Sequence, residues 1–263
     1  MLSQLRKYSA FFWMAVLHEH RHRMVIFSKI LFFFLILFIF DSLWKVLFAS
    51  GFRDSVSTND LIWYIAVTEW ILLSAPALHL DIQEDIHQGQ IAYHLGRPVP
   101  YAGMRLAEGL GTAYVRMFYI GIVGLGYVTF LSGDLVTRGP ALLAAFLIGP
   151  IAAVGISASF AAVGLAAFWI EDSKPIYWVY QKFLFILGGL MIPLNLYPDW
   201  VSSWAVWTPF AAFLYSPARS MIELSWVSFV MSLSVAVFWS AISVYLLFRL
   251  YRSCVQDVVV QGG

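Results

Sequence analysis

Six runs of apolar residues, each long enough to cross a bilayer, constrain this chain more than any other feature. They occupy residues 25–49, 60–80, 108–131, 140–170, 176–197 and 226–248. At 1.5 Å per residue, a helix of about 20 residues crosses a hydrocarbon core of ~30 Å. Lipid offers no partner to an open strand edge, and the alternating pattern of a barrel is missing from the sequence. The sequence therefore predicts an all-α integral membrane protein, a single domain with six transmembrane helices.

The composition agrees with this prediction. Hydrophobic residues make up 61% of the chain and charged residues only 12%, whereas a soluble domain has about 25% charged residues. The net charge of +1 provides no basic field for nucleic acid, so we expect no nucleic-acid partner. The single cysteine, Cys254, excludes an internal disulfide.

The distribution of lysine and arginine predicts the orientation in the membrane. With the N-terminus inside, the outer segments contain only Arg53, Arg138 and Arg219. The cytoplasmic segments then contain Arg6, Lys7, Arg21, Arg23, Arg97, Arg105, Lys174, Lys182, Arg249 and Arg252. We therefore expect both termini, and residues 81–101, to be cytoplasmic.

Two segments outside the six runs are also apolar. Residues 1–24 mix aromatic and aliphatic side chains with a basic cluster, which predicts an interfacial helix that lies along the inner leaflet and contacts membrane lipids. Residues 198–225 contain three tryptophans and are interrupted by Pro198, Pro209 and Pro217. They are too broken to span, so we expect short helices that fold back into the outer interface, a re-entrant outer segment.

Charged residues within the apolar runs are costly to bury, at about 2.5 kcal/mol or more each. Glu69 lies in the middle of the second run and Arg116 well inside the third. We hypothesise that these two form an intramembrane charge pair or face a shared polar cavity. A purely structural ion pair and a role in handling a substrate both remain open. Asp41 and Lys45 are four residues apart and fit a local pair at the helix surface.

Motifs for catalysis or nucleotide binding do not occur in the sequence. It lacks the G-x-x-x-x-G-K-[ST] loop, the G-x-S-x-G turn and the H-E-x-x-H helix. On a helix, His18 and His22 share a face and His20 points away, so two nitrogens and Glu19 could meet a metal at most. We favour a cationic patch at the level of the lipid headgroups. We therefore expect no catalytic residue, cofactor or metal in this chain.

The stretch "DIQEDIHQGQIAYHLGRPVPY", residues 81–101, separates two apolar runs with polar residues. Ile82 and Ile86 form one apolar ridge of a short helix that Gly89 can end. Ile91 and Leu95 repeat the same four-residue spacing before Arg97-Pro98 ends the second piece. Helices this short are marginal in water, so we expect the segment to be stabilised by docking to a partner. An ordinary solvated loop is the alternative.

At these residues the sequence resembles a known family. The pattern D-I-x-x-D-I-x-x-G-x-I-x-x-x-L-x-R-P-x-x-Y is similar to the permease subunits of ABC-2-type exporters, and most of all to a branch of similar length classed as an uncharacterised transport system. The later stretch "GGLMIPLNLYPDWVSSWAVWTPFAAFLYSPA" resembles the same branch. One departure is "HQG" at 87–89, where relatives often carry Arg-Ser-Gly.

The resemblance implies a function and a set of site residues. The segment 81–101 would be a coupling helix that lies in a groove of a cytosolic ATP-binding subunit, and the N-terminal helix would also contact that subunit. The coupling residues implied are Asp81, Ile82, Asp85, Ile86, Gly89, Ile91, Leu95, Arg97 and Pro98. The outer segment would close an extracellular gate formed by Pro193, Tyr197, Pro198, Trp200, Trp207, Pro209 and Phe210.

The resemblance also implies partners and a location. Two permeases, identical or homologous, would meet two cytosolic ATP-binding subunits, which would bind the ATP and Mg. The complex would lie in the cytoplasmic (inner) membrane of a bacterium and export its substrate between the permeases, near the second and fifth spans. Two other classes remain open from the residues alone. These are a membrane-embedded lipid or acyl transferase and a membrane assembly scaffold.

Overall fold

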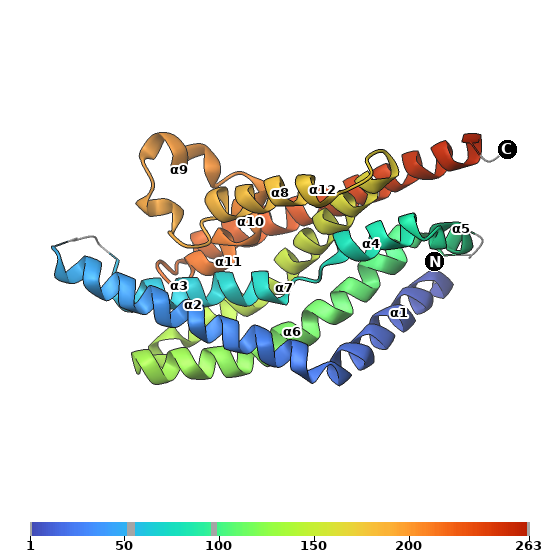
Figure 1. Ribbon diagram of the computed structural model, residues 1–263. Coiled ribbons are helices and arrows are strands. Elements are labelled where there is room, and N and C mark those ends of the chain that lie inside the picture. Colours follow the sequence, from blue (N-terminus) through green and yellow to red (C-terminus); the bar gives the residue numbers. More distant parts are fainter. Residues whose placement is uncertain (1, 52–55, 96–98, 262–263) are drawn as a thin grey trace.

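The computed structural model describes residues 2–51, 56–95 and 99–261, and all elements within these ranges are helical (Figure 1). Arg97 and Pro98 of the predicted coupling set lie outside the described residues. In chain order the elements are α1 (Leu2–Arg21), α2 (Arg23–Ala49), α3 (Thr58–Ser74), α4 (Leu78–His87), α5 (Gln90–Leu95), α6 (Tyr101–Ser132), α7 (Leu135–Leu165), η1 (Ala166–Phe168), α8 (Lys174–Leu187), η2 (Leu194–Leu196), α9 (Asp199–Ala205), α10 (Pro209–Phe213), α11 (Tyr215–Arg219) and α12 (Trp226–Gln261).

Five helical stretches in the described part of the chain are long and apolar enough to cross a membrane. They are Arg23–Ala49, Thr58–His87, Tyr101–Ser132, Arg138–Phe168 and Trp226–Gln256. Each corresponds to one predicted apolar run, although α6 begins at Tyr101 rather than at 108. An all-helical membrane protein is therefore confirmed.

The predicted fifth span, 176–197, is shorter than expected. Its helix α8 has 14 residues and ends at Leu187, so it extends about 21 Å, less than the ~30 Å hydrocarbon core. Gly189 then adopts a left-handed conformation with φ +64°, which ends the helix. The Tyr64 hydroxyl donates to the Gly189 carbonyl over 2.6 Å, and this contact fastens the turn to α3.

α3 and α7 form the centre of the molecule. In an apolar stretch of 18 residues within each span, 78% of the residues of the α3 span and 67% of those of the α7 span are buried, compared with 17% for α2 and 28% each for α6 and α12. The glycines and serines of α7 permit close approach. A Cβ at Gly155 would meet the Phe213 ring, and the Ser240 hydroxyl of α12 donates to the Ile151 carbonyl over 2.8 Å. The Ala-, Gly- and Ser-rich sequence of α7 therefore packs closely against other helices.

The outer segment consists of the short helices α9, α10 and α11, as predicted for a run interrupted by prolines. Pro198 precedes α9, and Thr208 caps α10 by accepting from the Ala211 backbone N–H over 3.3 Å. Trp200 and Trp207 are exposed, at 75% and 56%. Their exposure is compatible with contact to lipid headgroups.

Figure 1 places the N-terminus, the C-terminus and α5 at one end of the molecule. The helix α9 and the C-terminal end of α2 lie at the opposite end. The two termini thus share an end with segment 81–101, which is the arrangement predicted from the basic residues.

Candidate functional site at the break between α3 and α4

The helix that crosses the centre of the molecule is broken at Ala75-Pro76-Ala77. Pro76 has no backbone N–H, and it forces Ala75 into an extended conformation with φ −62° and ψ 134°. α3 therefore ends at Ser74 and α4 begins at Leu78. The last carbonyls of α3 have no partner within the helix and need donors from elsewhere.

Two cations from neighbouring helices supply these donors. The Lys29 ammonium of α2 donates to the Leu73 carbonyl over 2.6 Å, and the Arg116 guanidinium of α6 approaches the Ala75 carbonyl at 3.4 Å. Both positive charges also lie at the negative end of the α3 dipole, which stabilises them. The break is thus fixed by contacts to two other helices.

The predicted pair between Glu69 and Arg116 is not formed. The Arg116 Nε donates instead to the Glu19 Oε1 of α1 over 2.7 Å, and both side chains are largely buried. The reason is the position of α1, which packs along α6 at Gly103 and Gly111. The sequence predicts α1 at the membrane surface, where Glu19 would not reach a charge within a span, whereas α1 packs against α6.

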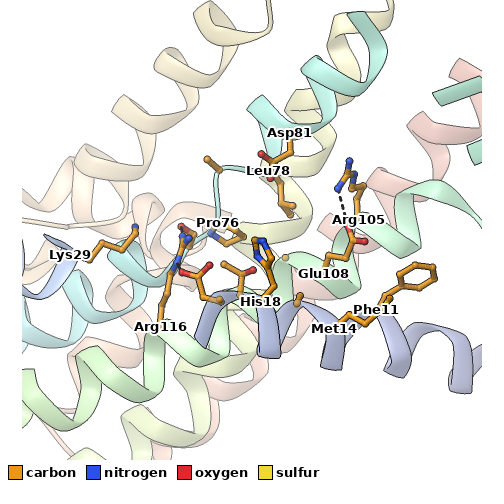
Figure 2. Close-up of a pocket in the computed structure, with 16 residues that line it drawn as sticks. Phe11, Met14, His18, Lys29, Pro76, Leu78, Asp81, Arg105, Glu108 and Arg116 are labelled. Atoms are coloured by element: carbon orange, nitrogen blue, oxygen red, sulfur yellow. Dashed lines mark hydrogen bonds and ion pairs between the residues drawn. The ribbon is translucent and has the colours of Figure 1, made fainter. Parts of the chain in front are cut away.

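A cavity of about 750 Å³ lies beside the break, between α1, α4 and α6 (Figure 2). Phe11, Met14 and His18 enter it from α1, and Leu78 and Asp81 from α4 on the opposite side. Its charged lining residues are His18, Glu19, Lys29, Asp81, Arg105, Glu108 and Arg116. Most of these charges are paired, as for Arg105 and Glu108 over 2.9 Å, so the cavity is polar without a strong net charge.

α4 is held to the rest of the chain by its buried face. Ile82 is fully buried against α7, where a Cβ at Gly164 would lie 2.9 Å from the Ile82 Cβ. The Asp85 carboxylate accepts from the Arg105 Nε over 2.8 Å and from the Tyr101 hydroxyl. Ile82, a member of the predicted coupling set, therefore packs against the chain itself, and its coupling role stays a prediction. Ile91 of α5 is also buried, and Ile86 is half-buried.

The opposite surface of α4 and α5 is polar and exposed. Glu84 and Gln88 form a hydrogen bond over 2.7 Å on this surface, and Gly89 makes the turn between the helices with φ +67°. The role of Gly89 in ending α4 is confirmed. The other exposed residues are Asp81, His87, Gln90 and Tyr93. The structure describes the backbone of Leu95 but not its side chain.

The loop after α7 adds a further negative charge beside α4. The backbone N–H of Lys174 donates to the Asp172 carboxylate over 3.0 Å, which lowers the pKa of this exposed carboxyl below its ordinary value. The Glu171 carbonyl of the same loop lies 2.8 Å from the His87 Nε2. The solvent-exposed surface formed by α4 and this loop therefore carries several acidic groups.

A second cavity, of about 420 Å³, lies on the other side of the break, between α2, α3, α7 and α8. It is lined by Glu69 and by Tyr177 and Gln181 of α8, with aromatic rings around them. Sequence reasoning identified Glu69 as unusual, but it missed Tyr177 and Gln181. Both are polar residues at i and i+4 of α8, and this spacing could have shown that they share a face.

The residues predicted to form an outer gate lie around the short helices. The Tyr197 hydroxyl donates to the Ile186 carbonyl over 3.0 Å, and the Phe210 ring stacks on Phe183 at 5.6 Å. The Trp207 carbonyl accepts from the Trp239 indole of α12 over 2.8 Å. Pro193 precedes η2 and is buried. These contacts link the segment to α8 and α12, and the gate itself stays a prediction.

An all-helical membrane domain with this polar segment at one end is consistent with the family resemblance of the sequence. A family model described as "ABC-2 family transporter protein" matches residues 57–262. The chain belongs to this ABC-2 family. It is a multi-pass membrane permease, the transport component of an ABC transporter, and such permeases in general work with ATP-binding partner subunits. No curated protein matches the ABC-2 chain.

Proposed function

We propose that this ABC-2 permease is the membrane subunit of an ATP-driven exporter. Two copies, or one copy and a homologue, would form the translocation path and bind two cytosolic ATP-binding subunits, which hold the ATP and Mg. The observation that supports this best is α4, a short helix whose inner face is anchored in the permease while its outer face is exposed and polar. A helix in this position is suited to receive force from a soluble partner.

The contacts of α4 define how such a force would be transmitted. A partner that moves α4 would also move α6 through Asp85 and Arg105, and α7 through Ile82 and Gly164. The break at Pro76 lets α4 change its angle to α3 without bending a continuous helix. Tilting α6 and α7 relative to α3 as rigid bodies would open and close a path between two permeases, which is alternating access.

The distribution of basic residues supports a cytoplasmic position for α4 and for both termini in the inner membrane of a bacterium. The acidic exposed surface of α4, with Asp81, Glu84 and the nearby Asp172, then favours a basic groove on the ATP-binding subunit. In this proposal the buried residues Ile82, Asp85 and Ile91 position the helix rather than contact the partner.

Charge reversal on the exposed face tests the proposal. We expect Glu84→Lys to reduce co-purification of the ATP-binding subunits by about tenfold, because like charges across an interface cost several kcal/mol. Glu223→Lys, an equally exposed site near the start of α12, is the matched control and should leave the complex intact. Equal recovery of the ATP-binding subunits with both variants, or their absence from the wild-type complex, would refute the docking role of α4.

A further inference from the structure

The smaller cavity differs from the larger one in its electrostatics. Its volume of about 420 Å³ lies within the range of about 300–1,000 Å³ that ligand sites occupy. The larger cavity is lined by paired charges, whereas the lining of the smaller one is mainly aromatic and aliphatic. It lies where α2 and α3 meet α7 and α8, which are far from them in the sequence.

Glu69 is the charge that this cavity leaves without a partner. Its side chain lines the cavity, its residue is only 3% exposed, and within the described residues it has neither a hydrogen bond nor an ion pair. Lys29 also borders the cavity, but its ammonium is bonded to the Leu73 carbonyl. The charges near Lys29 are Arg116 and Glu19, on the far side of the break. A buried carboxylate without a counter-charge is costly, and a cation in the cavity would remove this cost.

Aromatic side chains belong to the lining of the cavity together with Glu69. The Tyr177 ring stacks on His79 with ring centroids 3.6 Å apart, and Phe160 contacts Tyr177 edge-on at 5.1 Å. Phe185 completes the aromatic lining, and the Gln181 amide adds a polar group. Aromatic faces attract cations, and they do so most strongly where water is excluded.

We infer that this cavity binds a lipophilic cation, an amine or onium group on an apolar body, with Glu69 as its counter-charge. Only the statement that this molecule is the cargo rests on the proposed function; its binding to the permease does not. The site takes a positive charge beside Glu69 and an apolar body against the aromatic and aliphatic lining.

The binding experiment uses the full-length permease in lipid nanodiscs. The probe is tetraphenylphosphonium, and the matched neutral probe is tetraphenylsilane, which carries the same four phenyl rings on a tetrahedral centre. We expect the wild type to bind the cation at least about tenfold more tightly than the neutral probe, which corresponds to about 1.4 kcal/mol. Glu69→Gln should weaken binding of the cation by about tenfold or more and leave the neutral probe unchanged. Glu223→Gln, the same chemical change at an exposed position, should leave both affinities unchanged.

The inference is overturned by a wild type without preference for the cation, or by Glu69→Gln with unchanged affinity for it. If Glu69→Gln does not fold, the ratio of the wild-type affinities for the cation and the neutral probe decides the test alone. ATP-dependent uptake of the cation into inverted vesicles separates the inference from the proposed function. Binding without uptake would refute the assignment as exported cargo and keep the site, and uptake independent of Glu69 would refute the site and keep the exporter.

Discussion

Arg116 shows how one residue joins three helices. It belongs to α6, pairs with Glu19 of α1, and approaches the Ala75 carbonyl at the end of α3. Physical reasoning from the sequence predicts that a charge within a span needs a partner. The sequence could not identify that partner, because the choice between Glu69 and Glu19 depends on where α1 packs.

A double-mutant cycle measures the interaction free energy between Arg116 and Glu19. Arg116→Met should lower the free energy of unfolding by about 3 kcal/mol or more, because it leaves the Glu19 carboxylate buried and unpaired. Combined with Glu19→Gln, the two losses should be non-additive by about 0.5–3 kcal/mol. The same cycle with Glu69→Gln is the control and should be additive within about 0.5 kcal/mol. Coupling of Arg116 to Glu69 rather than to Glu19 would contradict the structure.

At the scale of helices, local chemistry predicted many boundaries. Gly89 ends α4 with positive φ, and the proline-interrupted sequence gives three short helices instead of a span. The break at Pro76, in contrast, lies inside the run 60–80, which the sequence predicts as one continuous span. The length of α8 could not be predicted, because 176–197 is apolar throughout while the turn after Leu187 is stabilised by Tyr64 from a distant helix. The sequence also could not predict which surface buries the apolar ridge of α4. Such a ridge indicates burial, but packing on α7 rather than on a partner is decided by the tertiary structure.

The contact between α1 and α6 requires a residue without a side chain at position 111, which is Gly111. A Cβ at Gly111 would lie 2.9 Å from the Ala15 Cβ and would also clash with the Phe12 carbonyl of the α1 backbone. We expect Gly111→Ala to destabilise the protein by about 1–3 kcal/mol, because backbone cannot move aside as a side chain can. The thermal unfolding midpoint in detergent measures this loss.

Gly126 of the same helix provides the matched control, since a Cβ there has no neighbour within 4 Å. Gly126→Ala should leave the midpoint unchanged or raise it, because alanine favours a helix by about 1 kcal/mol over glycine. Equal midpoints for both variants would show that α1 does not pack against α6 at Gly111.

The whole molecule has two chemically different ends. One end carries both termini and the acidic surface of α4, and the other carries α9 with its exposed tryptophans (Figure 1). In an inner membrane the first end would face the cytosol, because the basic residues gather in its segments. Cys254 is the single cysteine of the sequence, and it is buried. A variant in which it is replaced therefore provides a background without native thiols.

Single cysteines test this orientation. On the Cys254→Ala background, Gln88→Cys should react with a membrane-impermeant maleimide in inverted vesicles and not in intact spheroplasts. Trp200→Cys should show the opposite pattern, and the buried Ile82→Cys should react in neither. Labelling of Gln88→Cys from the outside would reverse the topology and remove the basis for a cytosolic partner.

The three residues between α3 and α4 also set an angular register. Each residue of an α-helix turns the chain by about 100°, so the length of Ala75-Pro76-Ala77 determines which side of α4 faces α7. One inserted residue there would move Asp81 to the buried position of Ile82 and Glu84 to the buried position of Asp85. The composition of α4 would be unchanged, but Leu80 and Ile86 would take the exposed positions of Asp81 and His87. For this protein, the number of residues at the proline joint is therefore as specific as their identity.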